Sequence, residues 1–372
     1  MARRIRMGLI GGGPGSFIGP VHAMAARLDG QIDLVAGVFS RDAARNALAA
    51  AGYGVDPARA YADVEALLAQ EALRPDGIDF VTIATPNAHH AAAATAAIDA
   101  GVAVLSDKPM TATLAEAQQI VARLAHNPVP FGLTYTYTGY PLVREMRARV
   151  AAGAIGTLRK VAVEYSQGWL AGAAESRQAQ WRLDPARSGE GGCIADIGVH
   201  AFHLAEFIGG TPVVRLAADL GSVVHGRALD DDCQVFLRFA NGARGLLMAS
   251  QVMTGEGNGL AIRLYGSTGG LRWSQEEPNH FDWLREDGGL ERVRAGDPSL
   301  GAAARRATRL PGGHPEGLIE ALGNLYRDFA GSLAGEPGSL VPDAGQGLRG
   351  MAFIAASVAA SRAGAGWVEF AP

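Results

Sequence analysis

The sequence predicts an α/β protein in two domains. Residues 1–135 are expected to form a doubly wound parallel sheet, and residues 136–372 an α/β domain with a large, mostly antiparallel open sheet. Strand-like apolar runs alternate with helical patterns up to about residue 135, which is typical of a parallel sheet. Longer β-type segments then follow one another, and Asn241-Gly242 between two of them is a strong hairpin signal. A chain of 372 residues is also long enough for two domains.

The N-terminal elements follow from their apolar patterns. Strands are expected at 5–10, 32–39, 78–84, 102–105 and 129–135, and helices between them at 21–28, 42–51, 63–72, 88–100 and 113–125. Gly101 is expected to end its helix in a left-handed conformation. Helices that connect successive strands in this way produce parallel pairing.

The C-terminal elements have a different pattern. A helix is expected at 140–152, ended by Gly153, and further helices around 194–208, 315–333 and 344–363. The β-type segments lie at 158–169, 213–224, 233–239, 243–252, 260–265 and 270–274. Residues 287–313 are rich in Gly, Ala and Arg and are expected to form a loop.

Composition excludes several functional classes. The net charge is −4 and no Lys/Arg block forms a phosphate-binding patch, so no nucleic-acid partner is expected. No apolar run reaches membrane-spanning length, and the N-terminal apolar run ends in glycines rather than in a signal-peptide cleavage site. Cys193 and Cys233 are too few for a disulfide framework. We therefore expect a cytoplasmic protein without a membrane partner.

Lysine is scarce in this chain. Of the 33 basic residues, only Lys108 and Lys160 are lysines. A chain that uses arginine almost everywhere keeps lysine by chance, or where a compact ammonium with an adjustable pKa is needed. Chance explains Lys160, whereas the position of Lys108 in the predicted sheet favours a chemical role.

The first strand, a glycine-rich turn and a helix open the chain. Gly11 and Gly13 fit the start of a G-x-G-x-x-G motif, Ser16 occupies the third position, and Gly19 can replace it in a longer turn. Such a turn lets the backbone and the helix N-terminus approach a pyrophosphate. A flexible tight turn is the alternative, but the position between strand and helix favours dinucleotide binding. The expected cofactor contacts in this turn are Gly11, Gly13, Phe17 and Ile18.

Ser40-Arg41 follows the second strand, where the adenosine ribose would lie. The acidic residue that would accept a hydrogen bond from the 2′-hydroxyl of NAD is missing at this point. Ser40 and Arg41 could hold the 2′-phosphate of NADP, or Arg41 could stack on adenine while Asp42 caps the next helix. These residues leave NAD and NADP both open.

Thr85-Pro86-Asn87 follows the third strand and is expected to reach the nicotinamide ribose. The alternative is a turn that begins a helix with Asn87 as N-cap, and the two roles are compatible. His89 and His90 begin that helix. A histidine in a first turn usually packs or caps, and only His90 is given a cofactor contact.

Asp107-Lys108-Pro109 follows the fourth strand. Pro109 fixes the turn, and Lys108 is expected to project to where nicotinamide and substrate meet. There an ammonium can donate to a reacting hydroxyl and stabilise developing negative charge on its oxygen. A surface salt bridge between Lys108 and Asp107 is the alternative, and the scarcity of lysine argues against it.

A second constellation lies in the C-terminal domain. Glycines at 189–192 lead into a helix on which Asp196 and His200, four residues apart, share one face. A carboxylate beside an imidazole raises the pKa of that ring and orients it, which suits a proton acceptor near neutral pH. His203 could compete for this role, and the apolar stripe of the helix indicates that one of the two histidines only packs.

Two other interpretations concern the same region. Cys193, Asp196, His200 and His203 could bind zinc, but nothing supplies a second cluster and no metal is expected. Aromatic side chains could stack on a sugar ring, although such stripes more often belong to a core. Tyr135 and Tyr137 are expected on one strand face, and Tyr165, Gln167 and Trp169 on another. Trp181 adds a further ring, and the substrate contacts expected from all these residues are Tyr137, Gln167 and Trp181.

These motifs occur in the order found in the glucose–fructose oxidoreductase/inositol dehydrogenase (Gfo/Idh/MocA) family, which the chain resembles over essentially its whole length. The resemblance implies a Rossmann domain, an α/β domain whose open sheet often mediates oligomers, and Lys108, Asp196 and His200 as the catalytic set. Trp181-Arg182 and the segment from Gly313 to Gly317, which contains His314, resemble the levoglucosan and scyllo-inositol dehydrogenase branch. That branch favours NAD as the cofactor, with NADP possible, and implies a substrate contact from His314.

Three features depart from the family pattern: Asp107 stands where Glu is usual, the glycine turn is longer, and no acid follows the second strand. Residues and resemblance together predict a dehydrogenase that moves hydride from a secondary hydroxyl of a cyclic sugar or polyol (an inositol, pyranose or anhydrosugar) to nicotinamide. His200 would remove the hydroxyl proton, Asp196 would orient His200 or the substrate, and Lys108 would polarise the reacting oxygen. A homo-oligomer, dimer or tetramer, is expected. The alternatives are a non-catalytic NAD- and sugar-binding regulator and an NAD-assisted glycosidase.

Overall fold

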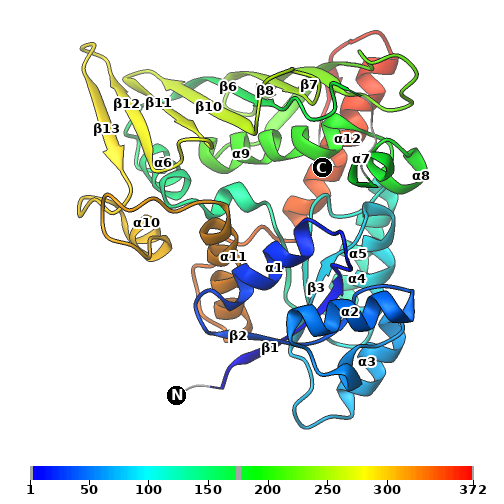
Figure 1. The fold of residues 1–372 in the computed structure, drawn as a ribbon. Helices are drawn as coiled ribbons and strands as arrows, with labels where there is room; N and C mark the ends of the chain where they lie inside the picture. Colours follow the sequence, from blue (N-terminus) through cyan, green and yellow to red (C-terminus); the bar gives the residue numbers. More distant parts are fainter. Residues whose placement is uncertain (1–2, 173–176, 371–372) are drawn as a thin grey trace. The chain divides into compact units, whose positions relative to one another are not determined.

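The computed structural model describes residues 3–172 and 177–370 and divides into two compact units (Figure 1). The first unit holds Met1–Thr136 and Leu322–Leu348, and the second holds Tyr137–Ala321 and Arg349–Pro372. No helix among the described residues is long and apolar enough to cross a membrane.

The first unit contains a five-stranded sheet with the order β2-β1-β3-β4-β5, and every pairing in it is parallel. This confirms the predicted doubly wound parallel sheet. The strands are β1 (Ile5–Gly11), β2 (Ile32–Val38), β3 (Phe80–Ala84), β4 (Ala103–Ser106) and β5 (Phe131–Leu133). The connecting helices are α1 (Ile18–Arg27), α2 (Ala43–Tyr53), α3 (Val64–Ala72), α4 (His90–Asp99) and α5 (Leu114–His126), with short 3-10 turns η1 (Pro57–Arg59) and η2 (Asn87–His89).

Side-chain caps fix where several of these helices begin. Asp42 and Asp63 accept hydrogen bonds from the backbone N–H groups of Arg45 and Ala66 at the starts of α2 and α3. Thr113 and Glu116 form a reciprocal capping box at the start of α5. Gly101 follows α4 with a positive φ of 71°, as expected from the sequence.

Helix α11 (Leu318–Leu333) changes the expected domain division, which assigned all residues after 135 to the second domain. Residues Leu322–Leu348 belong to the first unit, and Arg349–Pro372 return to the second. Phe329 on this helix packs edge to face on Phe80 of β3, with ring centroids 5.3 Å apart. The backbone of Leu133 in β5 donates to Pro342 at 2.8 Å. A late stretch of chain therefore completes the first core, and no local pattern could reveal this.

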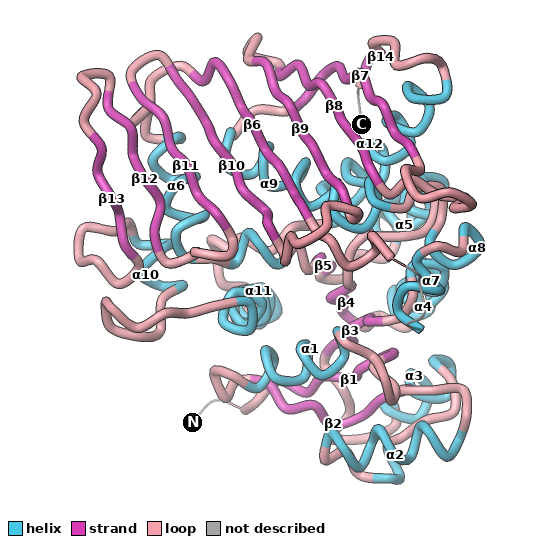
Figure 2. Tube along the Cα trace, turned by 45° about the horizontal axis from the view of Figure 1, so that its top comes forward, coloured by secondary structure: helices cyan, strands magenta, loops and turns pink. Residues whose placement is uncertain are grey.

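The second unit is built on a nine-stranded sheet with the order β13-β12-β11-β10-β6-β9-β8-β7-β14 (Figure 2). All pairings are antiparallel except β6 with β9. The mostly antiparallel sheet is thus confirmed. Its strands are β6 (Leu158–Ser166), β7 (Val213–Gly221), β8 (Asp232–Phe239), β9 (Arg244–Ser250), β10 (Gly259–Gly266), β11 (Gly269–Ser274), β12 (His280–Arg285), β13 (Leu290–Arg294) and β14 (Val368–Glu369).

One face of this sheet is covered by α6 (Pro141–Ala151) and α9 (Val199–Gly209), whereas the opposite face carries no helix of the described chain (Figures 1 and 2). The remaining elements are η3 (Thr136–Gly139), α7 (Arg177–Arg182), α8 (Pro185–Ser188), the π-helical turn η4 (Ile194–Gly198), α10 (Ala302–Ala307) and α12 (Ala344–Arg362). Buried and exposed side chains alternate along β8. Val235 and Leu237 point to the helices and are buried, whereas Phe236 points to the uncovered face and is exposed.

Residues 287–313 are not the loop expected from the sequence. They contain β13 and α10. Strand β13 buries only Val293 among its five residues, so its sequence shows no apolar alternation. It is held instead by charged neighbours, since Arg292 and Arg272 both donate to Asp282 on the strand between them, at 2.8 and 2.9 Å.

Candidate active site

The glycine turn of the first unit is packed too closely for side chains at three positions. A Cβ on Gly11 would lie 2.4 Å from the carbonyl oxygen of Ala84, and one on Gly13 would lie 2.4 Å from that of Phe39. A Cβ on Gly19 would lie 2.3 Å from the Cα of Gly12. The turn is therefore pressed against the ends of β2 and β3 and against α1, with its backbone free of side chains, as a pyrophosphate cradle requires.

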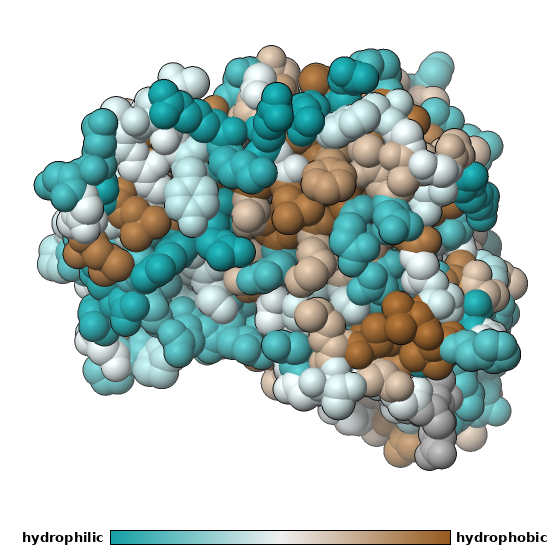
Figure 3. Space-filling model, turned by 90° about the horizontal axis from the view of Figure 1, so that it is seen from above, coloured by the Kyte–Doolittle hydropathy of each residue, from teal (hydrophilic) through white to brown (hydrophobic). Residues whose placement is uncertain are grey.

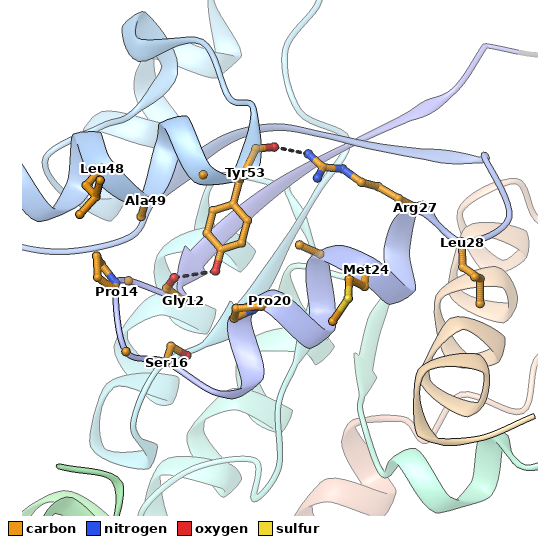
Figure 4. A pocket seen from close by; sticks show the side chains of 14 residues that line it. Gly12, Pro14, Ser16, Pro20, Met24, Arg27, Leu28, Leu48, Ala49 and Tyr53 are labelled. Carbon is orange, nitrogen blue, oxygen red and sulfur yellow. Dashed lines mark hydrogen bonds between the residues drawn. The ribbon is translucent and has the colours of Figure 1, made fainter. Parts of the chain in front are cut away.

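Two side chains of α2 hold this turn in place. The hydroxyl of Tyr53 donates to the carbonyl of Gly12 at 2.6 Å (Figure 4). Arg45 donates to the carbonyl of Pro14 at 2.6 Å. Tyr53 also lines a cavity of about 740 Å³ between α1 and α2, together with apolar side chains that include Met24 and Leu48. Sequence reasoning missed both anchors, because neither residue stands out by type or spacing in this alanine-rich helix.

The segment after β2 is arranged around Asn46. Its side chain accepts from the backbone N–H groups of Phe39 and Ser40, at 2.8 and 3.2 Å, and donates to Tyr61. Asp42 caps α2, as one interpretation of the sequence held. Arg41 is exposed, so its guanidinium is accessible to a ligand. The contacts of Ser40 and Arg41 with a cofactor remain predictions.

His90 joins the ends of β3 and β4. It is 1% exposed, its Nδ1 lies 2.8 Å from the carbonyl oxygen of Pro109, and its Nε2 lies 2.9 Å from that of Thr85. The ring therefore ties together the two turns that were expected to face the nicotinamide. The N-cap role suggested for Asn87 is wrong: Asn87 begins η2 after Pro86, and His89 is the N-cap residue of α4.

Asp107 and Lys108 lie directly after β4, and the Lys108–Pro109 peptide bond is cis. Oδ1 of Asp107 accepts from the backbone N–H of Lys108 at 2.8 Å and from the hydroxyl of Thr134 at 2.9 Å. Burial alone would raise the pKa of the Asp107 carboxyl, but the facing His22 and the charges of Lys108 and His90 hold that pKa well below its usual value. Asp107 is therefore an anion, with 16% of its side chain exposed, that fixes the backbone of Lys108.

In the second unit, Asp196 lies on the π-helical turn η4. Asp230 anchors the start of this turn: its carboxylate accepts from the N–H groups of Gly192 and Ile194, both at 2.7 Å, and its carbonyl accepts from Cys193 at 2.8 Å. A Cβ on Gly192 would lie 2.2 Å from the carbonyl oxygen of Asp230, so this position admits only glycine. The sequence predicted a regular helix here and gave no indication of Asp230.

The carboxylate of Asp196 has two partners that the sequence did not predict. Its Oδ2 accepts from Nε of Arg182 and from Nε2 of Gln251, both at 2.9 Å. The Arg182 guanidinium also lies over the ring of Trp181, 4.4 Å from its centroid. The expected orientation of His200 by Asp196 remains a prediction.

The two histidines of α9 have different surroundings. The ring of His200 lies edge to face with that of Tyr137, with centroids 4.8 Å apart. His203 stacks instead against Phe207, at 6.1 Å. Burial, and to a lesser degree the charge of Arg147, lowers the pKa of His203 to about 3, which makes its ring a weak proton acceptor near neutral pH. His200 is therefore the better candidate for the base.

A polar network adjoins His200 and includes a residue that sequence reasoning missed. The amide oxygen of Asn258 accepts from the hydroxyl of Tyr165 at 2.8 Å and from Gln167 at 2.7 Å, and its nitrogen donates to the hydroxyl of Tyr137 at 3.2 Å. The hydroxyls of Tyr137 and Tyr165 also hydrogen-bond each other. Burial raises the pKa of both tyrosines, so both hydroxyls keep their protons. Asn258 follows β9 in a polar loop and has no sequence signal.

Several of the expected strand positions are corrected by the structure. Tyr137 lies in η3 and Tyr135 just before it, so the two do not share a strand face. Strand β6 ends at Ser166, which places Gln167 and Trp169 beyond it. Trp169 donates to Gln167 at 2.7 Å. His314 is exposed in a turn, where its Nδ1 lies 3.1 Å from the carbonyl oxygen of Pro311.

The suggested zinc ligands do not gather in the structure. No group of three or more His, Cys, Asp or Glu side chains among the described residues is placed to hold a metal ion. Cys193 and Cys233 are both buried and free, and burial together with the adjacent Cys233 raises the pKa of the Cys193 thiol.

Comparison with known proteins shows which family the chain matches. Residues 5–135 match the oxidoreductase family with an NAD-binding Rossmann fold, and residues 143–272 match the GFO/IDH/MocA C-terminal domain. The chain is 34% identical to the uncharacterized oxidoreductase YfiI of Bacillus subtilis, over 100% of this chain and 98% of that protein. It is 28% identical to levoglucosan dehydrogenase of Pseudarthrobacter phenanthrenivorans, over 79% of this chain and 80% of that enzyme.

A solved structure is similar over nearly the whole chain. The inositol dehydrogenase homolog of Azotobacter vinelandii in complex with NAD+ superposes with a TM-score of 0.95 at 34% identity, covering 99% of this chain and 98% of that one. The same protein has been solved with NADH and myo-inositol, with a TM-score of 0.93. The glycine cradle fits NAD, whose bound nicotinamide supplies the hydride acceptor or donor. The chain is thus an NAD-dependent oxidoreductase of the Gfo/Idh/MocA family.

Proposed function

We propose that the protein is a dehydrogenase that oxidises a secondary hydroxyl of a cyclic sugar or polyol. The observation that carries the proposal is the network around His200, in which uncharged hydroxyl and amide groups of Tyr137, Tyr165, Gln167 and Asn258 lie together. Such groups both donate and accept, which suits a neutral ligand with several hydroxyls.

The proposed roles follow from the chemistry of each side chain. The ammonium of Lys108 would donate to the alcohol oxygen and stabilise the negative charge that develops there. His200 would accept the hydroxyl proton, because the lowered pKa of His203 makes that ring a weak proton acceptor near neutral pH. Asp196, which is held by Arg182 and Gln251, would orient His200 or a neighbouring substrate hydroxyl. The reduction in the opposite direction would use the same groups.

The substrate class is narrowed by the named relatives. One is a levoglucosan dehydrogenase and another an inositol dehydrogenase homolog solved with myo-inositol. Both ligands are rings with several hydroxyls and no net charge. We therefore propose an inositol, a pyranose or an anhydrosugar, contacted by Tyr137, Gln167, Trp181 and His314 as well as by the catalytic groups. Ser40 and Arg41 are proposed to lie by the adenosine of NAD.

The test is a turnover screen with NAD and NADP over inositols, hexoses and anhydrosugars, read as NADH absorbance at 340 nm. We expect turnover with at least one cyclic polyol and a preference for NAD. Tight NAD binding without any turnover would indicate a regulator instead. Release of an aglycone from a glycoside without net NADH would indicate a glycosidase.

We also propose that the protein works in the cytoplasm as a homo-oligomer, and the open face of the nine-stranded sheet supports the oligomer. Apolar side chains gather on this face among hydrophilic ones (Figure 3). Phe236 on β8 and Leu246 on the adjacent β9 pair across the strands and are 54% and 37% exposed. Sedimentation velocity should show a dimer or tetramer that Phe236→Asp dissociates, and a monomeric wild-type protein would contradict the proposal.

A further inference from the structure

Three polar side chains lie buried behind the turn that carries Lys108. They are His22 on α1, Tyr326 on α11 and Thr82 on β3, with exposures of 0%, 1% and 0%. His22 Nδ1 lies 2.8 Å from the hydroxyl of Tyr326, which lies 3.1 Å from the hydroxyl of Thr82. His22 Nε2 lies 3.9 Å from Oδ2 of Asp107. All four groups belong to the first unit.

The chemistry of these side chains indicates which of them donates and which accepts in each hydrogen bond. The Thr82 hydroxyl lies 3.1 Å from both the sulfur of Met7 and the hydroxyl of Tyr326, and sulfur is the weaker acceptor. When Thr82 donates to Tyr326, Tyr326 donates to His22 Nδ1, and the remaining ring proton lies on Nε2. Burial raises the pKa of Tyr326 well above its usual value, so its hydroxyl keeps the proton to donate. The N–H of His22 then faces the Asp107 carboxylate across 3.9 Å, which is longer than a hydrogen bond, so the contact is electrostatic.

The other side of the Asp107 carboxylate holds the backbone of Lys108. Oδ1 accepts from the N–H of Lys108 at 2.8 Å and from Thr134 at 2.9 Å. The far end of the same turn is held by His90, which lies 2.8 Å from the carbonyl oxygen of Pro109. The turn is thus held at one end by the buried ring of His90 and at the other by Asp107, whose carboxylate faces the buried ring of His22.

We propose that His22 and Tyr326 are positioning residues for Lys108: they fix the carboxylate of Asp107, and Asp107 fixes the backbone from which the ammonium extends. This inference rests on the proposed role of Lys108 toward the reacting alcohol. It also gives the late segment Leu322–Leu348 a function, because α11 supplies Tyr326 to a turn more than 200 residues earlier in the chain.

The kinetic test compares Tyr326→Phe, His22→Leu and His22→Gln with a matched control, Tyr61→Phe. Tyr61 also has a buried hydroxyl that donates to a carboxylate of the first unit, Glu71, at 2.7 Å, but it does not belong to this chain of groups. We expect kcat to fall about 10-fold or more in Tyr326→Phe and His22→Leu with the KM values for NAD and substrate changed little, because misplacement of a reacting group acts on the chemical step. Gln keeps an N–H donor, so His22→Gln should retain more activity than His22→Leu.

A second measurement does not depend on turnover. Protein labelled with 13C at lysine Cε should give two lysine side-chain signals, since Lys108 and Lys160 are the only lysines, and Lys160→Arg assigns them. We expect the Lys108 signal to shift or broaden in Tyr326→Phe and His22→Leu, while Tyr61→Phe leaves it unchanged and Lys160 is unaffected in all variants.

The two measurements separate the inference from the proposed function. Folded variants with the wild-type Lys108 signal and the wild-type kcat would overturn the positioning role and leave the dehydrogenase intact. The Lys108 signal could shift in Tyr326→Phe and His22→Leu as expected while the wild-type protein oxidises no cyclic polyol. This result would support the positioning role and overturn the proposed substrate class.

Discussion

His203 on α9 should link the stability of the protein to pH. The pKa of His203 is lowered from its usual 6.5 to about 3 in the folded protein. Between these values the unfolded chain binds a proton at this ring and the folded chain does not. The free energy of unfolding therefore falls as the pH falls from 6.5 toward 3.

The size of this effect follows from the depth of the shift. Each pH unit inside the window corresponds to about 1.4 kcal/mol, so lowering the pH from neutral to about 4.5 removes roughly 2–3 kcal/mol through His203 alone. His203→Leu removes this titration. We expect the variant to lose less stability over the same pH interval than the wild type, by roughly this amount.

The assay is urea unfolding at pH 7.5 and pH 4.5, followed by tryptophan fluorescence. All five tryptophans of the chain lie in the second unit, as His203 does, so the signal reports the relevant unit. The difference between the two pH values is compared within each protein, which cancels any packing change caused by leucine. An equal loss in wild type and His203→Leu would refute the reasoning. The variant should also retain turnover, whereas His200→Leu should not.

Two further predictions concern the turns that support the site. Gly13→Ala would place a Cβ 2.4 Å from the carbonyl oxygen of Phe39, so the turn must move. The Kd for NADH, measured by fluorescence titration, should therefore rise about 10-fold or more. Gly52→Ala serves as a neutral control, because Gly52 has open space around it. Asp230→Asn turns an acceptor into a donor that faces one of two backbone N–H groups, so unfolding of the second unit should become easier by about 1–3 kcal/mol and kcat should fall. Wild-type stability and kcat in Asp230→Asn would show that Asp230 does not hold the turn that carries Asp196.

The parts of the fold that could be predicted are those determined by local pattern. The five parallel strands follow from apolar runs separated by helices, and the hairpin between β8 and β9 follows from Asn241-Gly242, where Gly242 has a φ of 85°. Strand β13 could not be predicted, because it is held by ion pairs with its neighbour rather than by an apolar face. Helix α11 was expected, but its membership in the first unit depends on contacts of Tyr326 and Phe329 that are distant in sequence.

The candidate site shows the same limit. Chemically distinctive residues such as Lys108, Asp196 and His200 could be selected from the sequence by their type and spacing. The residues that hold them could not: Asp230, Asn258 and Gln251 are ordinary polar residues in the sequence. Their importance comes from distances of 2.7–2.9 Å to groups far along the chain. Sequence spacing identifies reactive groups, whereas tertiary contacts identify what orients them.

Lys108 and His200 are proposed to act on one and the same alcohol, and a double-mutant cycle tests this proposal most directly. NADH formation is measured under single-turnover conditions for the wild type, Lys108→Ala, His200→Ala and the double variant, with NAD affinity measured in parallel. Groups that act as a unit give non-additive losses. We expect each single variant to fall to a small but measurable single-turnover rate with NAD binding largely intact, and the double variant to be no slower than the slower single variant. Losses that multiply in the double variant, or a near-wild-type rate in Lys108→Ala, would contradict this expectation.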